Sequence, residues 1–464
     1  MQKLVIFYYI DMQNATNSMT DSLYQLQSSQ NKTDKYLSSP ANLVMALLYA
    51  VNGSNHKAQK ELLGFLGTHK NELTILNNEA VSLQKESTES KVMSIVNTML
   101  VDKKINLSNS YYKFAKRLGK ILTMDVKNPQ KVVDKVNDLV YNGTHGMIPT
   151  ILKTSDITNM TSAIVLSTLY IKPQWIKPFE KDDTYKSAFT TLNKKNKQID
   201  FMHKTSFMDY GETDSFQIVS LSCKDQFKVN IFLPKKYYST RLFDTTFVPP
   251  YILRSNKVKL SLPKFKMMSE LDIRDNLQMA NVKGIFDPDQ GLEKAINHTN
   301  EKDKLYISKI IHKAIFELDE NGVEAAAATA IKMDLCNAIP EKEDITEFNA
   351  NTSFRYQVIY KNNIVLFDGV YDGQIYETHS SLNREVDVDS DKGKRVYDNN
   401  DNDDEYVPRG WDDINNDEME REIRLKKFDD KQWHKKPVTW VVVGAFVVAM
   451  IYYLMKINKA KLNN

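Results

Sequence analysis

The 464-residue sequence predicts an α+β protein with one transmembrane helix near the C-terminus. Three features support this prediction. Residues 323–335 alternate in polarity as a strand does, short runs of β-branched and aromatic residues lie on both sides of this segment, and residues 437–455 carry no charge. The hydrophobic content of 42% is ample for a core, and a chain of this length forms either one large domain or two or three smaller ones.

Residues 323–335 alternate between an uncharged set and a set that holds every charge of the segment. This period-two pattern is typical of a strand with one buried face. The consecutive alanines at 325–328 favour a helix instead, so on this segment alone an exposed Ala-rich helix fits equally well. The uncharged set consists of Val323, Ala325, Ala327, Thr329, Ile331, Met333 and Leu335.

The flanking segments favour the strand interpretation. Upstream, residues 307–314 (ISKIIHKA) alternate like a short strand, and downstream lie residues 348–356 (FNANTSFRY) and 364–369 (IVLFDG). Together with ELDENGVEAAAAT at 317–329, these segments resemble the hinge and the C-terminal signature of the serpin family.

Three further motifs follow the order of the family. SP at 39–40 resembles the start of its second helix, YIKPQW at 170–175 followed by Phe179 resembles its YFKGxW strand, and LPKFK at 262–266 resembles its LPKFK element. The resemblance covers residues 14–371.

The resemblance implies the serpin fold: a large mixed main sheet, two smaller sheets, about eight or nine helices and an exposed reactive loop. It also implies a protease inhibitor rather than an enzyme, acting as a monomer. A target serine protease attacks the loop and forms an acyl-enzyme. The cut loop then inserts into the main sheet, drags the protease along and distorts its active site.

The hinge of the reactive loop falls, by this resemblance, between residues 320 and 329. Glu320 matches the acidic residue at the base of the loop, and Gly322 supplies a flexible pivot. Val323 stands where the family usually has Thr. The uncharged alternate set suits insertion, because a buried charge would cost several kcal/mol. The hinge residues are Glu320, Gly322, Val323, Glu324, Ala325, Ala326, Ala327, Ala328 and Thr329.

The scissile bond is placed by counting along the loop from Glu320, as in the family. The count gives Cys336–Asn337, with Leu335–Cys336 as the alternative. Both P1 side chains are moderately small and apolar, which suits a chymotrypsin- or elastase-like pocket. In a shorter loop, Asp334 would suit a cysteine protease such as a caspase. Lys332 falls too early in the count, which disfavours trypsin-like targets.

Four residues lie, by resemblance, where the main sheet opens: Ser39, Asn42, Ser167 and His312. Asn42 stands where the family usually has Ser, and Ser167 where it usually has Asn. This is either an exchange that preserves one donor–acceptor network or two unrelated changes. We interpret His312 as a structural histidine rather than a catalyst.

Composition limits the partners and cofactors. The net charge of +3 gives no general attraction to nucleic acid, and two cysteines are too few for a disulfide framework. The histidines show no metal-ligand spacing, so we expect no cofactor. A basic cluster at helical spacing is either a solvated helix face or a polyanion site. It comprises Lys113, Lys116, Arg117 and Lys120.

The chain divides into five parts. An acidic, Asn-rich tether cannot bury enough apolar surface to fold, and the uncharged run that follows is long enough to span a bilayer, with aromatic residues near its ends. The parts are a short apolar segment at 1–13, a serpin-like domain at 14–375, the tether and a mixed-charge juxtamembrane segment at 376–436, the transmembrane helix at 437–455, and a short basic tail at 456–464.

The side of the membrane on which the domain lies is an open choice. Basic residues are more numerous before the span than after it, which favours a tail-anchored protein with its domain in the cytosol. Several Asn-x-Ser/Thr sequons favour the lumen or the exterior instead, although the N-terminal apolar run is short for a signal peptide. The expected partners are a target serine protease and, through 437–455, the lipid bilayer. The alternative function is a non-inhibitory binding module displayed on a membrane.

Overall fold

The computed structural model describes residues 10–29, 36–235, 252–289, 291–297, 304–320, 344–361 and 363–374. The chain separates into two compact units, 1–386 and 387–464, and every described residue belongs to the first. The predictions for the reactive loop after Glu320 and for the tether, span and tail lie outside the described residues. Within the described part of the chain, no helix is long and apolar enough to cross a membrane.

Three of the described α-helices begin with the expected proline or capping side chain. Pro40 occupies the first turn of α3 after Ser39, as the SP motif predicts. The side chains of Asn55 and Ser108 accept hydrogen bonds from backbone N–H groups in the first turns of α4 and α6. The α-helices are α2 (Ile10–Ser29), α3 (Pro40–Gly53), α4 (His56–Phe65), α5 (Leu73–Glu89), α6 (Asn109–Leu118), α7 (Pro129–Gly143) and α8 (Arg274–Met279). Short 3-10 helices are η2 (Thr154–Asp156), η3 (Lys181–Asp183), η6 (Gly284–Phe286) and η7 (Glu293–Ala295).

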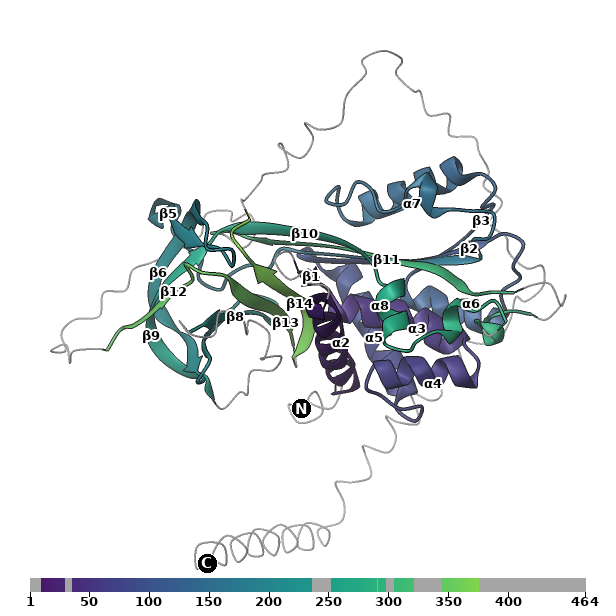
Figure 1. Cartoon of the computed structure of the whole chain (residues 1–464), viewed down its shortest axis with the longest axis horizontal. Coiled ribbons are helices and arrows are strands. Elements are labelled where there is room, and N and C mark those ends of the chain that lie inside the picture. The colour runs from purple at the N-terminus through teal and green to yellow at the C-terminus, as the bar shows by residue number, and fades with distance from the viewer. Residues whose placement is uncertain are drawn as a thin grey trace, which may run out of the picture. The chain divides into compact units, whose positions relative to one another are not determined.

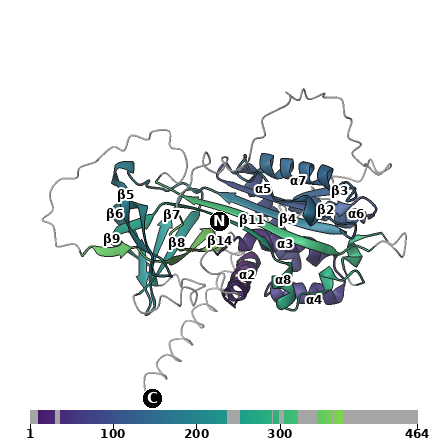
Figure 2. The same cartoon turned by 45° about the horizontal axis from the view of Figure 1, so that its top comes forward.

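A five-stranded mixed sheet has the order β10-β11-β4-β2-β3. Its two central neighbours, β11 and β4, run parallel, whereas β10 with β11 and β4 with β2 are antiparallel. Figure 2 shows β11 and β4 side by side in this sheet. The strands are β10 (Phe265–Asp272), β11 (Ile307–Leu318), β4 (Ala163–Ile171), β2 (Met93–Asp102) and β3 (Lys120–Met124).

A nine-stranded sheet has the order β1-β14-β13-β8-β7-β6-β9-β12, with β5 paired to β6 beside this path. Most of its pairs are antiparallel, but β12 runs parallel to β9. The strands are β1 (Leu37–Ser38), β5 (Thr184–Thr190), β6 (Asn196–Glu212), β7 (Phe216–Ser222), β8 (Phe227–Pro234), β9 (Arg254–Pro263), β12 (Thr346–Asn349), β13 (Phe354–Tyr360) and β14 (Ile364–Tyr371).

The described residues form two sheets and seven α-helices, not the expected three sheets and eight or nine helices. The long strand β6 explains the difference in sheets. Its first half pairs with β5, its last residues pair with β7, and β9 runs along its other edge. The two smaller sheets expected from the resemblance are thereby joined into one.

Helices cover both faces of the five-stranded sheet, with α7 on one face and α3 on the other (Figure 1). Val132, Val136 and Val140 follow helical spacing on α7 and pack with Ile164 and Leu166 of β4. The opposite face of the sheet belongs to the main core, which extends into the nine-stranded sheet. Because both faces are covered, β4 and β11 are buried along nearly their whole length, even where β11 carries polar side chains.

Two local predictions need correction. The strand predicted at 307–314 extends as β11 to Leu318, because the charged residues near its end are paired rather than solvated. Lys120 does not share a helix face with Lys113 and Lys116, since α6 ends at Leu118 and Lys120 begins β3. The basic cluster is therefore not one helical stripe.

Candidate functional site

The candidate site is the base of the segment that follows β11. Asp319 and Glu320 are the last described residues before 321–343, and they come directly after the end of β11 at Leu318. Residues 307–316 of β11 are in parallel register with 163–171 of β4. The segment therefore begins, at Glu320, from a strand in the centre of the five-stranded sheet.

Glu320 is held on two sides. Its carboxylate accepts hydrogen bonds from Lys264 Nζ at 2.9 and 3.2 Å, and its carbonyl accepts one from the Phe179 backbone N–H at 2.9 Å. Burial alone would raise the pKa of this carboxyl, but a backbone hydrogen bond and the Lys264 ammonium outweigh burial and lower the pKa. Glu320 is therefore ionised and anchored to the start of β10 at neutral pH.

Trp175 and Lys172 hold the preceding residues. The indole Nε1 of Trp175 donates to the Asp319 carbonyl at 2.8 Å. Lys172 Nζ, at the end of β4, lies 3.1 Å from Glu317 Oε1 and 3.0 Å from Asp319 Oδ2. Desolvation opposes the charge on Lys172, but the two carboxylates outweigh it and raise the lysine pKa. One ammonium thus links β4 to the end of β11.

His312 lies deeper in the same sheet and is fully buried. Its Nε2 accepts a hydrogen bond from the Ser39 backbone N–H at 3.2 Å, and its Nδ1 lies 3.2 Å from Ser167 Oγ. Burial lowers the pKa of His312 to about 3, so the ring is neutral at physiological pH. Because Nε2 accepts, the proton resides on Nδ1 and is donated to Ser167. Both nitrogens are engaged, which makes His312 a structural residue.

The structure brings the four residues of the predicted sheet-opening region together, and of the two exchanged side chains only that of Ser167 takes part in their network. Ser167 Oγ donates to the Asn42 carbonyl at 3.4 Å. The Asn42 side-chain amide is buried and makes no hydrogen bond within the described residues. The network therefore runs from Ser39 through His312 and Ser167 to the backbone of α3.

The remaining predicted site residues, 322–329 and 335–337, lie outside the described residues. Lys172, Trp175 and Lys264 all lay in recognised motifs without a role assigned to them. The sequence signal that could have identified them was a charged or hydrogen-bonding side chain next to the end of a predicted strand. In the described ranges, no group of His, Cys, Asp or Glu is arranged to hold a metal ion.

Comparisons with known proteins agree with this fold. The family model "Serpin (serine protease inhibitor)" matches residues 14–372, and the chain belongs to the serpin family. An uncharacterized serpin-like protein of Acanthamoeba polyphaga mimivirus is 26% identical over 375 residues, covering 78% of this chain and 89% of that protein. Alpha-1-antichymotrypsin of Homo sapiens is 25% identical over 345 residues, covering 71% of this chain and 80% of that protein.

Solved structures show the same fold. Native protease nexin-1 with heparin superimposes with a TM-score of 0.68 at 18% identity, over 78% of this chain and 99% of that chain. Serpin48 of the insect Tenebrio molitor gives 0.67 at 22% identity, over 78% of this chain and 98% of that chain. Those chains consist almost entirely of the matched part, and in this protein residues 1–386 form one compact unit. Serpins are generally protease inhibitors rather than enzymes, and the relatives support that general role.

Proposed function

We propose that the protein is a single-use inhibitor of a chymotrypsin- or elastase-like serine protease. The protease cleaves the segment after Glu320, and the freed segment inserts between β11 and β4. The observation that supports this proposal most directly is the parallel pairing of β11 with β4, immediately before that segment.

The pairing geometry favours insertion. A segment that turns back after β11 runs antiparallel to β11, and therefore also antiparallel to β4. Insertion would replace one parallel ladder by two antiparallel ladders, and antiparallel pairing is slightly more stable per residue. The uncharged set from Val323 to Leu335 supplies a face that can be buried without desolvating a charge.

The far end of the segment explains why cleavage is needed. After residue 343 the chain enters β12, which pairs with β9 in the other sheet through residues 346–349. An intact segment is thus attached to two different sheets. Hydrolysis at Cys336–Asn337 or Leu335–Cys336 would free the part attached to β11 while the part attached to β12 stays in place.

The covalent step follows from ordinary serine-protease chemistry. The protease serine oxygen attacks the P1 carbonyl, the peptide C–N bond breaks, and the new amine takes a proton from the catalytic histidine. The inhibitor is then held as an ester through its P1 residue. Insertion carries this ester away from the loop base and distorts the protease before water can hydrolyse the bond.

A protease panel tests the proposal. We expect residues 1–386 to form a complex with chymotrypsin or elastase that survives SDS. Ala327→Arg places a charge in the uncharged set and should turn the inhibitor into a substrate. The matched control, Ala326→Arg, changes the set that already holds Glu324 and Lys332 and should still inhibit. If the protease cleaves the unaltered protein and keeps its full activity, the result supports a non-inhibitory binding module instead. If a complex forms only with a caspase, Asp334 is the P1 residue.

We also propose that residues 437–455 anchor this inhibitor in a membrane, with its domain in the cytosol. The uncharged run and the excess of basic residues before it support the anchor and its orientation.

A further inference from the structure

Strand β6 has a stretch of unpaired edge. On the side away from β9, residues up to Met202 pair with β5, and residues from Asp209 onward pair with β7. Between them, residues 203–208 have no strand partner on that side within the described chain. The nine-stranded sheet therefore forks where β6 diverges from β7.

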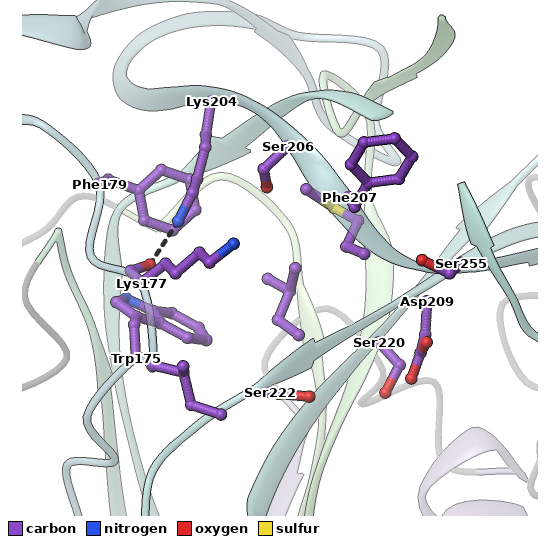
Figure 3. Close-up of a pocket in the computed structure, with 13 residues that line it drawn as sticks. Trp175, Lys177, Phe179, Lys204, Ser206, Phe207, Asp209, Ser220, Ser222 and Ser255 are labelled. Carbon is purple, nitrogen blue, oxygen red and sulfur yellow. Dashed lines mark hydrogen bonds between the residues drawn. The ribbon is translucent and has the colours of Figure 1, made fainter. Parts of the chain in front are cut away.

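The other arm of the fork is the chain that follows β4. Trp175 forms a bridge with Cys223 just after β7, and the Ile176 backbone N–H donates to the Ser222 carbonyl at 3.3 Å. Between this arm and β6 lies a cavity of about 210 Å³ (Figure 3). The sheet thus provides a hollow with one wall from β6 and one from residues 175–179.

Two lysines give one end of the cavity a positive charge. Lys204 Nζ donates to the carbonyls of Lys177 and Pro178, the latter at 3.1 Å, and lies 5.2 Å from the centroid of the Phe179 ring. Within the described residues, neither Lys204 nor Lys177 has a carboxylate within ion-pair distance. Burial, and next the nearby Lys177 charge, lower the pKa of Lys204 to about 8, although the Glu180 carboxylate acts in the opposite direction. An anion placed here would relieve that unfavourable charge.

The walls of the cavity are apolar and aromatic, with hydroxyl groups between them. Trp175 and Phe179 meet edge to face at 5.8 Å. Phe207 and Ile176, which also line the cavity, are 61% and 57% exposed. The hydroxyls of the lining serines make no hydrogen bond to the described protein, so they can bind a ligand. These serines are Ser206, Ser220, Ser222 and Ser255.

We propose that this cavity binds a small amphipathic monocarboxylate, with its carboxylate at Lys177 and Lys204 and its aryl or alkyl group between Trp175 and Phe207. The hydrogen bonds of Lys204 to the opposite arm close one end of the fork, which excludes a longer extended chain. Asp209 lies at the other side of the cavity from the two lysines (Figure 3) and disfavours a second negative charge.

The cavity shares a wall with the loop base. Trp175 and Phe179, which line it, also donate to the carbonyls of Asp319 and Glu320. A bound molecule would therefore contact the same two residues that hold Asp319 and Glu320, Trp175 through its indole N–H and Phe179 through its backbone N–H. Binding itself does not require that the protein inhibit a protease.

Tryptophan fluorescence provides a direct test. In residues 1–386 the only tryptophan is Trp175, because Trp411, Trp433 and Trp440 lie beyond them. We would titrate this fragment with 3-phenylpropanoate and with 3-phenylpropan-1-ol, exciting at a wavelength that the phenyl group does not absorb. We expect saturable changes with both, and a Kd for the acid about tenfold lower than for the alcohol, on the order of 1 mM for a ligand of this size.

Charge-removing variants test the assignment of the carboxylate. Lys204→Met keeps the alkyl packing against Phe179 and should bring the affinity for the acid down to that for the alcohol. The control Lys186→Met, on the exposed face of β5, should leave the affinities for both ligands unchanged. Lys177→Met is a second, independent variant. Because Lys177 is exposed, this substitution should not disturb folding, and it should weaken acid binding. The proposal is overturned if neither ligand saturates, if acid and alcohol bind equally to the unaltered fragment, or if acid binding survives both Lys177→Met and a folded Lys204→Met.

Discussion

Lys172 and Asp319 form an ion pair of 3.0 Å between the end of β4 and the residues just after β11. Insertion of a strand between β4 and β11 must separate this pair, because the two strands would no longer be neighbours. The same ammonium also contacts Glu317. The contact therefore stabilises the uncleaved form and would be lost in the proposed inserted form.

We expect Lys172→Met to destabilise the uncleaved protein by about 1–3 kcal/mol, since it leaves two largely buried carboxylates short of a partner. The variant should also convert more quickly to an inserted, inactive form on warming. Urea unfolding and residual inhibition after incubation measure the two effects. Lys85→Met is the control, since Lys85 and Glu89 form an exposed pair on α5; an equal loss in both variants would contradict the role of Lys172.

Cleavage within 332–337 should raise the Tm by about 10 °C or more, because insertion adds ladder hydrogen bonds and each kcal/mol shifts the Tm by roughly 2–4 °C. Ala327→Arg should abolish the increase and Ala326→Arg should retain it. Differential scanning calorimetry before and after cleavage is the measurement. An unchanged Tm for the cleaved unaltered protein would exclude insertion.

The burial of His312 predicts a pH dependence of stability. The pKa is about 3 in the folded protein and 6.5 for the ordinary group, so between these values the unfolded chain binds a proton that the folded chain does not. The free energy of unfolding therefore falls as the pH falls below about 6.5, by up to about 1.4 kcal/mol per pH unit.

His312→Gln should reduce this slope, whatever its effect on stability at pH 7.5. His203, whose pKa burial also lowers, lies on β6, and His203→Gln should leave most of the slope intact. Denaturant unfolding between pH 7.5 and 5.0 gives the slopes. Identical slopes for His312→Gln and the unaltered protein would show that another group carries the dependence.

Arg355 and Asp368 form a bidentate ion pair across β13 and β14, at 2.7 and 2.9 Å, with both side chains 0% exposed. Asp368→Asn removes the bidentate carboxylate partner of a buried guanidinium and should cost about 3–5 kcal/mol. Urea unfolding should show no comparable loss for Glu347→Gln, whose partner Lys259 is exposed. A loss of similar size in the two variants would be inconsistent with the buried pair.

Sequon accessibility tests the proposed orientation in the membrane. Asn159 is exposed, whereas the Asn52 amide donates to the Leu48 carbonyl and to Asn77. For a cytosolic domain, glycosidase treatment of membrane-derived protein should cause no mobility shift. A shift that becomes smaller in Asn159→Gln but is unchanged in Asn52→Gln would place the domain in the lumen or outside.

Local pattern was enough to predict the helix start at Pro40, the strand at 307–314 and the family. It was not enough for the contacts that organise the site. Lys172 and Glu317 are 145 residues apart, so neither residue reveals the other in a single sequence. The end of β11 was missed for the same reason, because Glu317 interrupts the apolar run unless its partner is known.

The two-sheet arrangement was missed because a strand that changes partners leaves no periodic signal. Nothing in residues 196–212 indicates where β5 gives way to β7 as the neighbour of β6. The cavity of the fork depends on that change and could not be anticipated. Its lysines and serines were, in the sequence, ordinary polar positions of a strand.

The attachment of the 321–343 segment to both sheets has a consequence for biosynthesis. The ribosome delivers this segment after β11 but before β12, β13 and β14. During that interval its far end is not attached to β9, so an uncut chain could form the inserted sheet on its own. If the segment inserts as proposed, the yield of competent protein would depend on how quickly the last strands emerge and pair. Slower translation of codons 344–371 should increase the share of newly made molecules that are already in the inserted, inactive form.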